Sequence, residues 1–373
     1  MTRKRFIIGL ILGLALVFFS WTGAQTTQAS CGSVTCFVVI GSAQQVSPEG
    51  LLTVNLSYNY TPQGTLLSGT NGVIPAVDVT TRKMILNHHQ EIRTISQLVA
   101  LDLNYGLTDR IGIEVAIPYK MLQHRHIDAL GEVGINGEGE ETRFTDSGIG
   151  DIFVNMKYNM LPTLSSMVVT GFGVYLPTGE NKAADPSGVG TFEPTAQLGR
   201  GQIGLQGSVY ATTEVIPHRI NLFSSASYRH TFRNNWGYQF GDQFDLNGGV
   251  NLVTAPWLVL TTQVNYRYMV HDSCSCSLAR SATPSDVGLF PGEAIDIDTN
   301  ITNRPVPTTG STFLAVTPGF SLNVGALTDQ AWANTIQVYF FSQIPVQRDF
   351  NGNLAQGVSY LAGITKYFSF SKS

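Results

Sequence analysis

Charge is scarce in this 373-residue chain, and this scarcity excludes several classes of protein. Asp, Glu, Lys and Arg make up 13% of the residues, with 22 basic against 26 acidic side chains. A chain without a basic excess is a poor fit for nucleic-acid binding, which depends on clustered Lys and Arg. Hydrophobic residues make up 43%, which argues against a disordered chain. We therefore expect an ordered protein with no nucleic-acid partner.

Long apolar runs are also missing, with one exception near the N-terminus. Basic residues at positions 3–5 precede an apolar stretch over residues 6–19, and small residues follow. This order is typical of a secretory signal peptide. We predict a signal peptide over residues 1–29, with cleavage after Ala24 or Ala29. No later stretch reaches the 18 or so uninterrupted apolar residues of a membrane helix.

Cysteine is limited to four residues in two close pairs. Cys31 and Cys36 are the candidate disulfide, because an exported protein meets an oxidising compartment. Cys274 and Cys276 lie too close together for an easy bridge. Lipidation of Cys31 stays open, although the aliphatic residue usual three positions before a lipidated cysteine is absent.

Catalytic signatures are absent as well. No GxSxG elbow or HExxH helix occurs, so we predict that the chain is not an enzyme and carries no cofactor. His88, His89, His124 and His126 are weak candidates for a divalent metal site, because imidazole nitrogens bind such ions. We interpret them as solvated loop side chains, and predict no metal.

Alternation of apolar and polar residues is what the sequence does contain, most clearly over residues 51–60 (LLTVNLSYNY). A period of two indicates a β-strand with unlike surroundings on its two faces. Such runs here are about twice the usual strand length of 5–6 residues and end in aromatics. That combination is typical of strands between lipid and a wet lumen. We predict an all-β, transmembrane, up-and-down antiparallel barrel over residues 50–373.

Twelve strands are predicted, and the connections between them support the count. Apart from one short outer loop at 233–237, long or medium connections alternate with tight ones, as outer loops and periplasmic turns do in outer-membrane barrels. Residues 30–49 would form a short periplasmic segment, and loops 61–90 and 271–310 would narrow the lumen. The predicted strands are residues 50–60, 91–105, 111–124, 147–160, 165–177, 200–214, 219–232, 238–253, 257–270, 311–325, 331–344 and 357–370. The predicted outer loops are residues 61–90, 125–146, 178–199, 233–237, 271–310 and 345–356.

The phase of the alternation assigns each side chain to lipid or lumen. The predicted lumen set is polar throughout, and its four acids balance four bases, which argues against strong ion selectivity. Alternatively, these charges pair and hold a narrow barrel shut. The lumen-lining prediction comprises Asn55, Asp102, Glu114, Lys120, Asp151, Lys157, Arg229, Asp245 and Arg267. The lipid-facing prediction includes Ile113, Leu260, Val264, Tyr266 and Phe340, with interfacial aromatics at Tyr60, Tyr105, Tyr119, Tyr158, Tyr175, Tyr228 and Tyr268.

Several segments resemble the outer-membrane barrel family of the MetA pathway of phenol degradation, whose members are described as transporters. They are residues 105–110 leading into 111–119, residues 147–151 leading into 157–158, residues 173–179 and, more weakly, residues 228–232. The resemblance implies an outer-membrane barrel that passes small hydrophobic or aromatic compounds. Each segment also has a purely structural explanation as a turn or a strand end.

We therefore predict a porin-like barrel for passive transport of small, hydrophobic or aromatic solutes across the outer membrane of a Gram-negative-type bacterium. Its expected partners are outer-membrane lipid and lipopolysaccharide, the barrel assembly machinery and a small-molecule solute. One alternative is a structural or binding barrel that acts through its outer loops, above all residues 271–310. A second is an outer-membrane lipid-modifying or hydrolytic enzyme.

Overall fold

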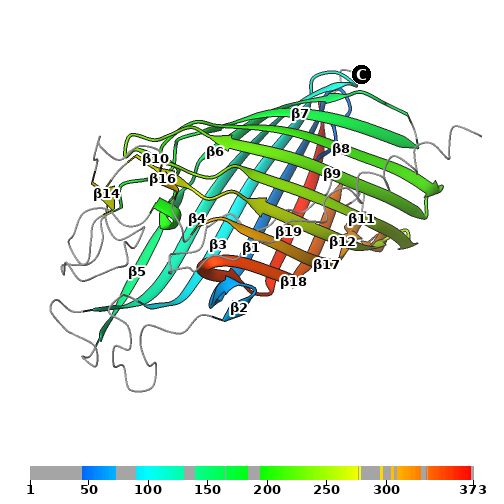
Figure 1. Ribbon diagram of the computed structural model, residues 1–373. Helices are drawn as coiled ribbons and strands as arrows, with labels where there is room; N and C mark the ends of the chain where they lie inside the picture. The colour runs from blue at the N-terminus through cyan, green and yellow to red at the C-terminus, as the bar shows by residue number, and fades with distance from the viewer. Residues whose placement is uncertain are drawn as a thin grey trace, which may run out of the picture.

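The computed structural model is a closed antiparallel barrel, seen with its strands tilted around a common axis in Figure 1. The predicted signal peptide, together with Cys31, Cys36, His88 and His89, lies outside the residues that the structure describes. The described residues are 44–72, 90–129, 139–163, 165–183, 194–275, 277–278, 295–296, 304–305, 309–328, 333 and 335–370.

Twelve wall strands make up the barrel, with β5 and β6 together forming one of them. The wall strands are β1 (Leu51–Gly69), β3 (Gln90–Gly106), β4 (Ile111–Ala129), β5 (Gly139–Ile149) with β6 (Ile152–Asn159), β7 (Ser166–Leu176), β8 (Gly204–Ile216), β9 (Ile220–Thr231), β11 (Gln243–Ala255), β12 (Leu258–Met269), β17 (Ser311–Asn323), β18 (Ile336–Gln356) and β19 (Ser359–Ser369). The predicted fold class and strand number are confirmed.

Short elements occupy the connections. They are β2 (Asn71–Gly72), η2 (Pro194–Ala196), β10 (Tyr238–Gln239), β13 (Ser273–Cys274), β14 (Ser277–Leu278), β15 (Ile295–Asp296), β16 (Arg304–Pro305) and α2 (Val324–Thr328). Within the described part of the chain, no helix has both the length and the apolar character needed to span a membrane.

Pairing between the first and last strands closes the barrel. β1 pairs with β19 from Leu51↔Ser369 to Tyr60↔Tyr360. Beyond this point β19 ends, and residues 63–69 of β1 pair instead with the second half of β18. This pairing joins the two ends of the twelve-stranded wall, which matters because unpaired backbone groups are costly in lipid.

Three predicted loops are partly strand. β4 and β5 extend into predicted loop 125–146 as a long ladder, which projects past the neighbouring strands in Figure 1. β1 similarly extends into predicted loop 61–90, and β18 includes all of predicted loop 345–356. Hydrophobic alternation could not reveal these extensions, because much of their sequence is polar on both faces.

An apolar belt covers the outside of the wall. The lipid-facing residues Ile113, Leu260, Val264, Tyr266 and Phe340 are all exposed. Their sequence neighbours point inward, so the outer surface is apolar where a soluble protein would be polar. This is the surface of a barrel that is surrounded by lipid.

Candidate functional site

A break in one wall strand receives the loop that follows β7. Between β5 and β6, the Asp151 carboxylate accepts hydrogen bonds from the backbone amides of Gly179 (3.2 Å) and Arg200 (2.9 Å). A Cβ at Gly150 would lie 2.7 Å from the Lys120 side chain, so a larger residue there would displace the end of that side chain. The two ends of the loop are thus fixed to the inner wall by one carboxylate.

Residues 194–200, which we call the inner loop, fold into the barrel. Ala196 and Leu198 are 1% and 2% exposed, and Ala196 packs against Leu122 of β4 and Phe144 of β5. The Lys120 ammonium donates a 2.6 Å hydrogen bond to the Leu198 carbonyl oxygen. The loop predicted at 178–199 was expected outside the barrel, whereas its described C-terminal part packs against wall strands β4 and β5. Predicted loops 61–90 and 271–310 lie largely outside the described residues.

Three cations lie in or beside the inner loop, and none of them forms an ion pair with a described carboxylate. They are Lys120, Arg200 and Arg229. The Arg229 guanidinium lies 3.6 Å from the centroid of the Tyr175 ring. Arg200 donates to the Thr231 hydroxyl (2.8 Å) and lies 4.7 Å from the Phe240 ring. Burial, followed by the positive charge of Arg229, lowers the pKa of Arg200 to about 9, so Arg200 keeps its charge at neutral pH.

The remaining predicted lumen charges are mostly paired. Lys157 lies 2.9 Å from Glu114, and Arg267 lies 3.0 Å from Asp245. Asp102 accepts a 2.8 Å hydrogen bond from Asn55. The equal numbers of acids and bases therefore conceal an asymmetry, because the bases left without an ion pair gather at the inner loop.

The inner face is not polar throughout, contrary to the sequence-based prediction. Tyr175 was expected in the outer aromatic girdle, but Phe172, on the opposite face of β7, is 57% exposed, which turns Tyr175 inward. There it lies 4.4 Å from Phe153 of β6, measured between ring centroids. Buried Tyr210 and Phe223 add a second inward-facing aromatic group.

Residues 44–49 enter the opposite end of the barrel. Val46 packs in one buried cluster with Val169, Tyr210 and Phe223 of β7, β8 and β9. On the other side, the Ser47 hydroxyl hydrogen-bonds to Thr53 of β1 (3.1 Å). These residues bridge opposite walls, and the periplasmic location of residues 30–49 stays a prediction. The Gly106 of the family-like turn allows this, since a Cβ there would lie 2.0 Å from the Pro48 carbonyl oxygen.

His124 and His126 are not the solvated loop residues that we expected. Both lie on β4, and they are 1% and 8% exposed. The His124 ring contacts the Thr94 hydroxyl (2.9 Å) and the His126 ring (3.0 Å). The described residues contain no group of three or more His, Cys, Asp or Glu side chains arranged to hold a metal ion.

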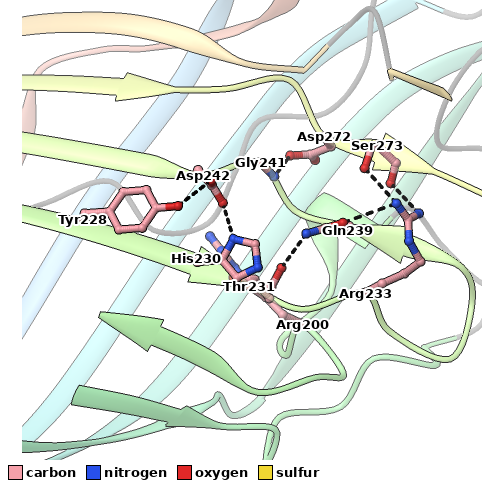
Figure 2. A network of polar contacts seen from close by, with 10 residues as sticks. All are labelled: Arg200, Tyr228, His230, Thr231, Arg233, Gln239, Gly241, Asp242, Asp272 and Ser273. Atoms are coloured by element: carbon pink, nitrogen blue, oxygen red, sulfur yellow. Dashed lines mark hydrogen bonds and ion pairs between the residues drawn. The ribbon is translucent and has the colours of Figure 1, made fainter. Parts of the chain in front are cut away.

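A polar network fixes the base of the long loop after β12 (Figure 2). β13 pairs with both β10 and β16, and Arg233 donates to the Ser273 hydroxyl (3.1 Å). Asp272 accepts hydrogen bonds from the Tyr238 hydroxyl (2.5 Å) and the Gly241 amide (2.6 Å). Burial raises the pKa of Asp272, and these two hydrogen bonds oppose that shift.

Sequence reasoning placed most of these residues on the correct face but missed their convergence. Arg200 was assigned to a strand start, and Leu198 to an outer loop. The signal lay in the family-like segments, which were read as turns and strand ends. Residues 147–151, 173–179 and 228–232 contribute Asp151, Tyr175, Gly179 and Arg229, and these surround the inner loop.

Residues 102–268, from within β3 to the end of β12, match the family described as "Putative MetA-pathway of phenol degradation". No curated protein matches the chain in sequence. An outer membrane channel from Pseudomonas putida superposes with a TM-score of 0.57 at 10% identity, covering 89% of this chain and 100% of that one. The transport unit of the autotransporter AIDA-I from Escherichia coli gives 0.44 at 7% identity, with coverages of 90% and 95%. The CymD monoaromatic hydrocarbon channel gives 0.37 at 9% identity, with coverages of 87% and 90%.

Proposed function

We propose that this chain is an outer-membrane barrel of the MetA-pathway type and that it lets small apolar or aromatic solutes diffuse passively across the outer membrane of a Gram-negative-type bacterium. The observation that carries the proposal is the mixed inner face. Inward-facing rings at Phe153, Tyr175, Tyr210 and Phe223 lie beside polar wall residues. Such a surface accepts an apolar ring without requiring full dehydration of a polar wall.

The predicted lumen residues support the same reading. We propose that Asn55, Asp102, Glu114, Lys120, Asp151, Lys157, Arg229, Asp245 and Arg267 line the lumen. Pairing of Glu114 with Lys157, and of Asp245 with Arg267, neutralises part of the wall. A neutralised wall holds a hydrated ion weakly, and it lowers the cost of moving an apolar solute past it.

Two segments would restrict the passage. The inner loop projects from the wall at one end, and residues 44–49 bridge the wall at the other. We propose that both limit the size of the solute and that neither requires coupling to an energy source. The expected contacts with lipopolysaccharide and with the barrel assembly machinery remain part of the proposal.

An enzyme is the weaker alternative. The His230 ring and the Asp242 carboxylate lie 2.7 Å apart, which is the base–acid half of a hydrolytic triad. The Tyr228 hydroxyl also donates to Asp242, and the described residues place no serine, threonine or cysteine in hydrogen-bond contact with the ring (Figure 2). This contact lies beside the outward-facing Tyr228 and Phe232. It is better explained as a polar anchor for the interfacial aromatics.

Uptake into liposomes tests the proposal directly. The refolded mature protein should admit benzyl alcohol faster than protein-free liposomes do, and should admit a sugar of similar size more slowly. Planar-bilayer recordings on the same sample should show small conductance. Equal rates with and without protein, for both solutes, would contradict transport and favour the binding-barrel alternative.

A further inference from the structure

Lys120, Arg200 and Arg229 gather beside the inner loop from three separate parts of the chain, and we call them the cation cluster. Lys120 comes from β4, Arg229 from β9, and Arg200 ends the inner loop. The positive charges of Arg200 and Arg229 both act on Lys120. Like charges held together inside a protein cost free energy unless an anion compensates them.

No described acid supplies this compensation through an ion pair. Asp151 and Asp272 are the acids whose charge reaches Arg200, and their oxygens already accept other hydrogen bonds. Asp151 receives two backbone amides, while Asp272 receives the Tyr238 hydroxyl and the Gly241 amide. The negative charges of both acids therefore offset part of the repulsion within the cation cluster, but neither carboxylate forms an ion pair with it.

Arg229 is the member best placed to bind a ligand. It is 7% exposed, and its Nε has no hydrogen-bond acceptor among the described residues. The guanidinium stacks on the face of the Tyr175 ring, 3.6 Å from the ring centroid. The Tyr175 hydroxyl in turn donates a 2.9 Å hydrogen bond to the Gln206 side chain. Stacking engages one face of the guanidinium, and the buried Nε on its edge keeps an unused hydrogen-bond donor among the described residues.

A carboxylate matches this arrangement. Guanidinium groups bind carboxylates through two parallel hydrogen bonds, and an Nε without an acceptor can provide one of them. Phe153 lies beside Tyr175, so an apolar or aromatic body attached to the carboxylate would meet rings instead of charges. Phosphate suits the guanidinium equally but is strongly hydrated, and an aromatic wall gives it no advantage.

We propose that the cation cluster binds the carboxylate of a small organic acid, with Arg229 as the direct contact and Lys120 and Arg200 adding positive potential. This inference rests on the proposed function, because it names the charged group that the lumen would select in its solutes. It predicts that the passage favours the anion of an aromatic acid over a neutral molecule of the same shape.

Calorimetric titration of the refolded mature protein in detergent tests the site, with benzoate, benzyl alcohol and inorganic phosphate as probes. Benzoate should bind saturably and at least tenfold more tightly than the other two. Arg229→Gln should weaken benzoate binding at least tenfold, and Arg200→Gln should weaken it less. Arg219→Gln, which changes an exposed arginine in a tight turn, should leave it unchanged. A heat-modifiable gel shift shows whether each variant is folded.

Unchanged benzoate affinity in folded Arg229→Gln, or no saturable binding to the wild type, would overturn the site. Equal affinity for phosphate would overturn the assignment to carboxylates. Liposome uptake of the same probes separates this inference from the proposed function. Benzoate binding without uptake of any probe would contradict passage and retain the site, whereas uptake of benzyl alcohol without benzoate binding would do the reverse.

Discussion

The Lys120 ammonium donates a hydrogen bond to the carbonyl oxygen of Leu198, 78 residues further along the chain. This contact ties the inner loop to β4, the strand that lies beside the break at Gly150. Lys120→Met removes the donor and leaves a similar volume. We expect the inner loop to loosen and the single-channel conductance in planar bilayers to rise about twofold or more, since the loop projects into the lumen.

The matched control for that variant is Lys366→Met. The Lys366 ammonium lies 5.3 Å from the centroid of the Phe368 ring. The neighbouring Thr365 is buried, so Lys366 lies on the opposite, outer face of the strand. Its replacement should leave conductance unchanged. Equal conductance in Lys120→Met and the wild type would show that the inner loop does not restrict the passage.

The ion pair between Glu114 and Lys157 is buried, with side chains 10% and 2% exposed. Glu114→Gln leaves a buried ammonium without its partner charge, which typically costs about 3 kcal/mol or more. We expect a loss of that order in the free energy of unfolding, measured by urea titration in lipid vesicles. The double variant Glu114→Gln/Lys157→Met should recover most of the loss. If the double variant is as unstable as the single one, packing and not charge governs this site.

The barrel itself could be predicted from the sequence, and the reason is the environment. Lipid on one side and a polar interior on the other impose a period of two, which stays visible in residues 51–60 and 258–269. The ladder of β4 and β5 beyond His124 lacks that contrast, so it was predicted to be a loop. The projection of these strands follows from backbone pairing, which leaves little trace in side-chain type.

The candidate site could be predicted only in part. Lys120, Asp151 and Arg229 were placed on the inner face by phase alone. Arg200 and Leu198 belong to a loop, and the path of a loop depends on contacts distant in sequence, here to Asp151 and Lys120. Counting charges also failed to show which of them pair, because Glu114–Lys157 and Asp245–Arg267 are defined by neighbouring strands.

Residues 44–49 should leave the barrel when Gly106 acquires a side chain. In Gly106→Ala the new Cβ would fall 2.0 Å from the Pro48 carbonyl oxygen and 2.3 Å from that of Ser47, so the segment must move. We expect higher single-channel conductance with little loss of barrel stability, since Gly106 is the last residue of β3. Gly207→Ala is the control, because a Cβ at this exposed position meets no atom within 4 Å. Conductance that rises equally in both variants, or in neither, would contradict a blocking role for the segment.

Asp272 should make the base of the long loop sensitive to pH. Burial raises the pKa of Asp272 above its ordinary value, so the folded protein binds this proton more tightly than the unfolded chain does. The resulting stabilisation is complete below the ordinary aspartate pKa, and it is lost as the pH rises through the raised value. Between about pH 4 and pH 7, the free energy of unfolding of the wild type should therefore fall relative to that of Asp272→Asn.

Urea titrations of both proteins across this range give the measurement. Arg200 and His271 also act on Asp272, and both lower its pKa. The comparison is therefore repeated with His271→Gln in both proteins, which removes the influence of His271 on Asp272. Stability curves that stay parallel from acid to neutral pH in this background would show that Asp272 is not held as a buried acid. Wild-type stability that rises relative to Asp272→Asn with rising pH would show that the hydrogen bonds from Tyr238 and Gly241 hold the charged form against its desolvation.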